Sequence, residues 1–182
     1  TATIPFILPD FTYTHLLKEP ILGGYFSINA QSLGVFRENG NRMFRAGGAV
    51  NWRKDWVFPF GFTSNAVFDT TASLYEAQGY TDAANGFLAR ADPSIGAELR
   101  WPLARNVSGG TVHVIEPIVQ VYYTEALGEE DNPNEDSQLP ELDDTNLFAL
   151  NRFPGVDRSE VGLRANVGLR YNRIAPAGWN LG

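Results

Sequence analysis

Acidic residues gather in one segment of the chain and offer the hard oxygen atoms that bind divalent cations. They are Glu129, Glu130, Asp131, Glu135 and Asp136, followed by Glu141, Asp143 and Asp144. Carboxylates at this density suit Ca²⁺, but an EF-hand loop needs alternating acidic positions, a central Gly and a closing Glu. That spacing is missing here, so the sequence favours a solvated acidic loop. We expect no metal site and no cofactor.

Side chains for acid–base or nucleophilic catalysis are scarce. The chain has two histidines, His15 and His113, and no cysteine. A serine hydrolase needs a Ser–His pair with an orienting carboxylate or amide, and a zinc protease needs two closely spaced histidines with a Glu. The sequence contains neither a G-x-S-x-G nor an H-E-x-x-H pattern. We therefore expect that the protein is not an enzyme.

A compact polar motif follows the acidic segment and ends just before the most regular part of the chain. Its residues are Asn151, Arg152, Phe153, Gly155, Asp157 and Arg158. The arginines have the planar, forked donors that bind phosphate groups. Arginines at a loop-to-strand junction more often hold backbone carbonyls and carboxylates in place. The sequence favours this second, structural role.

The elements that must position this motif are strands. From Val161 to Tyr171 the odd positions are apolar or aromatic, whereas the even positions include Arg164, Asn166 and Arg170. Alternation with a period of two places the two sets on opposite faces of a strand. Similar patterns predict seven strands, at about 6–16, 24–36, 42–53, 57–75, 92–103, 111–124 and 160–172. No segment of comparable length has a helical pattern.

The connections between these strands are of two kinds. Leu17–Gly23, Lys54–Trp56 and Ala104–Gly110 are short and rich in Gly, Pro or Asn, whereas 76–91 and 125–159 are long and polar. In an up-and-down antiparallel sheet, the two long connections fall at one end and the three short turns at the other. Long loops at one end and short turns at the other are typical of an outer-membrane β-barrel, in which the long loops are extracellular.

Alternation alone does not separate a lipid-facing barrel from a soluble sheet that encloses a protein core. The polar even face favours a wet lumen, and aromatic residues cluster near strand ends, as in interfacial girdles. They are Trp52, Trp56, Phe58, Phe60, Trp101, Tyr122, Tyr123, Tyr171 and Trp179. A net charge of −7 argues against a nucleic-acid partner, which would require a concentrated basic surface. These observations favour a membrane barrel, with Arg164, Asn166 and Arg170 facing the lumen.

The motif at 151–158, with the preceding Asn146-Leu147-Phe148 and the strand that follows, resembles the barrel domain of the lipopolysaccharide-assembly family LptD, also called organic solvent tolerance protein. Further similarity to the family covers Pro20 to Gly24, Trp101-Pro102 and Glu116 to Gln120. The sequence resembles alphaproteobacterial members of the family. Val156 and Pro154 depart from the usual residues of the family, which are an aromatic and a Ser.

The resemblance implies a section of a larger outer-membrane barrel in a Gram-negative bacterium. It implies that the parent inserts lipopolysaccharide into the outer leaflet, with an LptE-like lipoprotein plug inside the barrel and a periplasmic lipopolysaccharide-transport bridge delivering the substrate. The family's periplasmic domain, cysteines and gate-forming terminal strands have no counterpart in the sequence, so we expect a middle section of the barrel. A porin-like passive channel and a soluble all-β binding module remain the alternatives.

Overall fold

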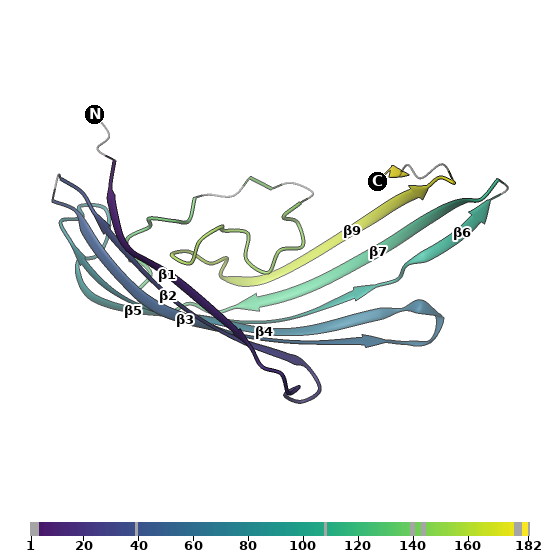
Figure 1. Cartoon of the computed structure of the whole chain (residues 1–182), viewed down its shortest axis with the longest axis horizontal. Helices are drawn as coiled ribbons and strands as arrows, with labels where there is room; N and C mark the ends of the chain where they lie inside the picture. Colours follow the sequence, from purple (N-terminus) through teal and green to yellow (C-terminus); the bar gives the residue numbers. More distant parts are fainter. Residues whose placement is uncertain are drawn as a thin grey trace.

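A single antiparallel sheet makes up the chain in this computed structural model, which describes residues 4–38, 40–107, 109–138, 141–142, 145–176 and 180–181 (Figure 1). Its strand segments are β1 (Phe6–Leu16), β2 (Tyr25–Phe36), β3 (Arg42–Val57), β4 (Thr63–Gln78), β5 (Gly86–Arg100), β6 (Leu103–Val107), β7 (Thr111–Thr124), β8 (Leu127–Gly128), β9 (Gly162–Ile174) and β10 (Asn180–Leu181). The helical content of the described residues is one short 3-10 turn, Pro59–Gly61. The expectation of an all-β chain is confirmed.

Strand neighbours in the sheet are also neighbours in the sequence. The order is β1-β2-β3-β4-β5-β7-β9-β10, and every pair is antiparallel. β6 continues the path of β5 beyond Trp101-Pro102 and pairs with the first half of β7, while the two-residue β8 pairs with β5. This is the up-and-down topology that the alternating patterns predict.

Several expected boundaries differ from those of the structure. The turn expected at Lys54–Trp56 is wrong, because β3 runs to Val57 and the chain reverses around Pro59–Gly61. The aromatic alternation of Phe58, Phe60 and Phe62 hides this turn. Proline has no amide hydrogen for the ladder, and both Phe60 and Gly61 have positive φ, at 66° and 76°.

Two other connections are shorter than expected. β4 and β5 extend to Gln78 and from Gly86, so residues 79–85 connect them instead of 76–91. Most of the turn expected at Ala104–Gly110 belongs to β6. Glu76 and Gln78 obscured the extension of β4, because here the polar side chains lie on the convex face and the apolar Tyr75 and Ala77 on the concave face. This reverses the pattern of the preceding residues of the strand.

The sheet is strongly curved, and the long segment between β8 and β9 folds back over its concave face (Figure 1). Side chains on the two faces differ in kind. In β9 the odd-numbered Leu163, Val167 and Leu169 are 69–74 % exposed on the convex face, whereas Arg164 and Asn166 are half-buried on the other. The register places Leu99, Val119 and Val167 side by side in the middle of the convex face.

Charged side chains on the convex face occur only near the strand ends, among the strand residues that the structure describes. Arg42 and Glu76 lie at the end that carries the long loop, and Lys54, Arg105 and Arg173 lie at the end with the short turns. Between these ends the convex face is apolar or uncharged. A small apolar cluster on the concave side comprises Val35, Met43, Tyr75, Ala77 and Leu88.

Candidate functional site: a charged loop over the concave face

The segment from Glu129 to Val161, called the inner loop below, brings two distant stretches of sequence together on the concave face (Figure 1). One stretch is the end of the acidic run, 132–137, and the other is the motif at 151–158. Each stretch bonds to the other and to side chains of the sheet. The acidic loop and the motif therefore form one site.

Asp157 is the centre of this site and has no solvent-exposed surface. Its Oδ1 accepts hydrogen bonds from Arg45 Nη1 of β3 at 2.5 Å and from the Tyr75 hydroxyl of β4 at 3.0 Å. Its Oδ2 accepts the backbone N–H of Glu135 at 2.8 Å. Burial raises the pKa of Asp157, and the charge of Arg45 opposes that rise. A buried carboxylate with three donors is strongly fixed in position.

Asp136 is the second carboxylate that pairs with the guanidinium group of Arg45. Its Oδ2 lies 2.8 Å from Arg45 Nη1, and its Oδ1 accepts the backbone N–H groups of Val156 and Asp157, both at 3.1 Å. Burial works against ionisation, but Arg45 and these donors hold the pKa of Asp136 below its ordinary value. A Cβ on residue 155 would lie 2.0 Å from Asp136 Oδ1, so this close approach requires Gly155.

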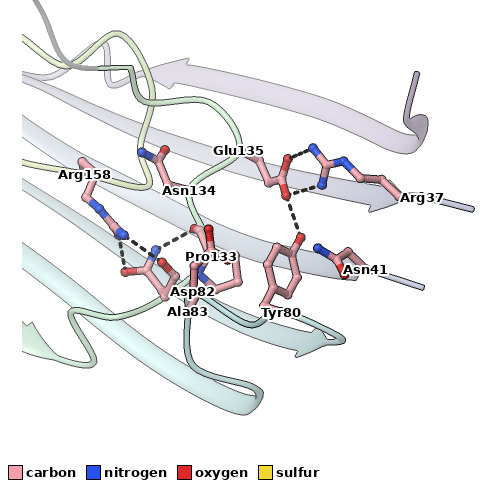
Figure 2. Close-up of a pocket in the computed structure, with 10 residues that line it drawn as sticks. Arg37, Asn41, Tyr80, Asp82, Ala83, Pro133, Asn134, Glu135 and Arg158 are labelled. Atoms are coloured by element: carbon pink, nitrogen blue, oxygen red, sulfur yellow. Dashed lines mark hydrogen bonds and ion pairs between the residues drawn. The ribbon is translucent and has the colours of Figure 1, made fainter. Parts of the chain in front are cut away.

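Glu135 joins the inner loop to the end of β2 in a second ion pair (Figure 2). Both of its carboxylate oxygens accept bonds from Arg37, at 2.5 and 2.6 Å, and Oε1 also accepts the Tyr80 hydroxyl at 2.6 Å. Burial opposes ionisation of the carboxyl, yet the hydrogen bonds from Arg37 and Tyr80 lower the pKa of Glu135. Burial and the neighbouring carboxylate raise the pKa of Tyr80, which stays a neutral donor.

Arg158 and Asn132 hold the two stretches of the inner loop together. Arg158 Nη1 donates to the Asn132 side-chain oxygen at 2.9 Å, and Nη2 donates to its backbone carbonyl at 2.9 Å. Asn132 has no exposed surface, and it donates to the Asp157 carbonyl at 3.3 Å. A buried pair on β5, Arg90 and Asp92 at 2.9 Å, lies beneath, and Arg90 also reaches Asn132.

The first residues of the motif, Asn151 and Arg152, are fixed beside the start of β9. Arg152 Nε donates to Glu160 Oε1 at 2.7 Å, and Arg164 donates to Glu160 Oε2 and to the Leu150 carbonyl. Burial disfavours the charged carboxylate, but the arginines lower the pKa of Glu160 below its ordinary value. Asn151 donates to the Arg158 carbonyl at 3.0 Å and accepts the Phe153 N–H at 3.3 Å, which closes the motif on itself.

A row of polar side chains crosses four adjacent strands under the inner loop. Asn65 and Gln120 both donate to Glu98 at 3.0 Å, and Asn166 donates to Gln120 at 2.9 Å. Gln120 also donates to the Phe148 carbonyl of the inner loop at 3.0 Å. Arg170 lies further along the same face, 3.3 Å from Glu116. These contacts are typical of a hydrogen-bonded polar interior rather than an apolar core.

The structure thus brings the motif residues together with partners that the sequence analysis missed. These are Arg37, Arg45, Tyr75, Arg90, Asn132 and Asp136. Arg45 and Arg90 stand on the polar face of alternating strands, and that was the available signal for carboxylate partners. Arg164, Asn166 and Arg170 share the concave face, with the inner loop in contact with Arg164.

The acidic segment differs from the solvated loop that its composition predicts. The side chains of Glu135 and Asp136 are only 8 % and 27 % exposed, and both pair with arginines of the sheet, so the expectation is wrong for these two residues. Among the described residues no group of three acidic or His side chains has the spacing of a metal site. Asp143, Asp144 and the aromatic Trp179 lie outside the described residues.

Comparison with known families agrees with this architecture. The family described as LptD, LPS transport system D, matches residues 1–181. The chain belongs to the LptD family. LptD is a lipopolysaccharide-transport component and an outer-membrane β-barrel of Gram-negative bacteria, so the antiparallel sheet is part of such a barrel. A search of curated proteins gave no match. In the part of the chain that the structure describes, no helix is long and apolar enough to cross a membrane.

Proposed function

We propose that this chain is part of the outer-membrane translocon that inserts lipopolysaccharide into the outer leaflet. The observation that carries the proposal is the contrast between the two faces of the sheet. The convex face is apolar between its charged ends and suits acyl chains. The concave face carries the network of Asn65, Glu98, Gln120 and Asn166 and suits the sugar part of the substrate.

In this arrangement the concave face is the barrel lumen, and Arg164, Asn166 and Arg170 face it. The inner loop enters the lumen from the end with the long connections, which is the extracellular end in barrels of this class. It would narrow the lumen on the side of β3, β4 and β5, where Arg45, Tyr75 and Arg90 bond to it. A lumen narrowed in this way favours lateral release of a lipid over free diffusion of solutes.

The motif residues Asn151, Arg152, Phe153, Gly155, Asp157 and Arg158 serve in this proposal to lock the inner loop, and they do not bind substrate phosphates. Arg158 donates to Asn132 and to the carbonyl of Asp157, and Arg152 pairs with Glu160. Both guanidinium groups therefore already have acceptors within the protein. An arginine that binds phosphate needs its fork free for the ligand.

Partners follow from the same proposal. An LptE-like lipoprotein plug would occupy the lumen, and periplasmic bridge proteins would deliver lipopolysaccharide from below. Polar concave-face residues near the short turns, Asn51, Arg53 and Asp55, lie away from the ion pairs of the inner loop. They offer hydrogen-bonding surface for the plug. The expectation that the chain is a middle section of the barrel remains part of this proposal.

Affinity purification of the tagged full-length protein in mild detergent tests the function. We expect lipopolysaccharide and a small lipoprotein to copurify in near-stoichiometric amounts. A porin-like channel would instead give steady ion conductance in planar bilayers and no lipoprotein partner. Protein that is monodisperse without detergent, with neither partner bound, would contradict a membrane barrel altogether.

A further inference from the structure

The convex face carries a basic cluster at the end with the short turns. The register of β6, β7 and β9 places Arg105, His113 and Arg173 in one row across three neighbouring strands. The adjacent row, one step toward the middle of the sheet, consists of Leu103, Ile115 and Tyr171. Residues directly opposite each other across a pleated sheet point to the same face, so a basic row borders an apolar row.

A groove of about 430 Å³ opens beside this cluster. Leu103, Val107, Ile115 and Tyr171 line it with apolar surface, and Arg105 and His113 stand at its polar side. The Tyr171 hydroxyl lies 2.7 Å from His113 Nδ1, which fixes the tyrosine ring against the groove. The site therefore combines apolar surface, against which an acyl chain can pack, with basic and hydroxyl groups at the same height on the sheet.

Arg105 is exposed, and among the described residues no carboxylate pairs with it. Most arginines on the concave face have the opposite character, since Arg45, Arg90 and Arg164 are all paired with carboxylates. An exposed guanidinium beside an apolar groove has the two properties that an anionic headgroup with a hydrophobic tail requires.

The position of the cluster along the membrane normal decides which leaflet its lipid comes from. Short turns lie at the periplasmic end of an outer-membrane barrel, and the apolar convex face begins immediately beside the basic row. The cluster is thus level with the headgroups of the periplasmic leaflet. The substrate of the proposed translocon enters the other leaflet, which is level with Arg42 at the opposite end of the convex face.

We propose that Arg105, His113, Arg173 and the adjoining groove form a binding site for an anionic glycerophospholipid of the periplasmic leaflet. The exposed guanidinium group of Arg105 contacts the phosphodiester, Arg173 adds positive charge in the same row, and the Tyr171 hydroxyl lies at the interface. One acyl chain lies along Leu103 and Ile115. This inference rests on a lipid-facing convex face and not on lipopolysaccharide insertion, so either can fail while the other holds.

Native mass spectrometry of the full-length protein, delipidated in detergent and titrated with phosphatidylglycerol, tests the site. We expect one tightly retained lipid, and about thirtyfold weaker retention for the variant R105A/R173A, on the basis of roughly 1 kcal/mol for each basic residue near an anionic lipid. R105K should retain part of the affinity. R42A removes a charge from the other end of the same face and should leave retention unchanged.

Other outcomes overturn the proposal. Equal retention of phosphatidylcholine, insensitive to R105A/R173A, would show an apolar groove without headgroup recognition. Displacement of phosphatidylglycerol by millimolar inorganic phosphate would show a simple anion site. Equal losses in R42A and R105A would show non-specific charge attraction. Heat-modifiable migration in gels checks that each variant is folded. If R105A/R173A does not fold, the same titration is made with R105A alone, because Arg105 is exposed and its substitution leaves the sheet intact.

Discussion

The assignment of the convex face to lipid is tested most sharply at Val167. This residue is 73 % exposed and lies between the first and last residues of β9, Gly162 and Ile174. Five steps separate it from Gly162, which at about 3.3 Å per residue and a tilt of about 40° is about 13 Å of height. The lipid-facing band of such barrels is about 25 Å tall, so Val167 lies near its middle.

An arginine at this depth should cost about 2–4 kcal/mol of unfolding free energy, because the bilayer centre solvates a guanidinium poorly. Leu163 is only one step into β9, so L163R should cost about 0–1 kcal/mol, although it lies on the same face. N166R has nearly the depth of V167R but lies on the concave face. It should cost about 1 kcal/mol, for the lost hydrogen bond to Gln120.

Urea unfolding of the full-length protein in phospholipid vesicles, followed by tryptophan fluorescence, measures these differences. The expected order of destabilisation is V167R, then N166R and L163R, which are similar to each other. If N166R were as damaging as V167R, the two faces would be equivalent and the lumen assignment would be refuted. If L163R matched V167R, depth would not matter, and the convex face would be covered by protein instead of lipid.

Three further predictions concern the inner loop, and protease accessibility of residues 129–160 in the full-length protein measures each of them. R45A leaves Asp157 buried without its cation and should weaken attachment of the loop by about 3–5 kcal/mol, whereas D157N, which keeps a polar partner, should weaken it less. G155A should release the loop, because its Cβ would meet Asp136 Oδ1 at 2.0 Å, and an unchanged digestion rate would refute that contact. The folded-state pKa of Glu135 lies below its ordinary value of 4.5, so its contribution is present above pH 4.5 and is lost as the pH falls through the lowered value; E135Q should remove this pH dependence.

Much of the fold could be predicted from alternation alone. In β9 the pattern of apolar and polar residues defines both the strand and its two faces. The turn after β3 could not be placed, because Phe58, Phe60 and Phe62 continue the alternation through a reversal that depends on backbone dihedral angles. Side-chain periodicity carries no information about a positive φ in a non-glycine residue.

The site was predictable only within the motif itself. Pairing of Arg152 with Glu160 follows from their separation of only eight positions in sequence. The partner of Asp157 does not, since Arg45 lies 112 positions away and the path of the inner loop decides which arginine it reaches. Several arginines stand on polar faces of strands, and composition does not distinguish among them. Only the three-dimensional course of the loop selects Arg45.

That separation also bears on the order in which the chain assembles. Closing an unstructured loop between residues 112 positions apart costs about 4 kcal/mol of chain entropy. The strands between Arg45 and Asp157 join neighbours through short connections, so successive hairpins shorten the effective distance step by step. If the ion pair of Arg45 and Asp157 formed first, it would cost the full entropy of loop closure. After β3 to β7 have paired, forming it costs little additional chain entropy. The contact that locks the inner loop is therefore a late event in folding, and it marks a section of sheet, from β3 to β7, that is already paired beneath it.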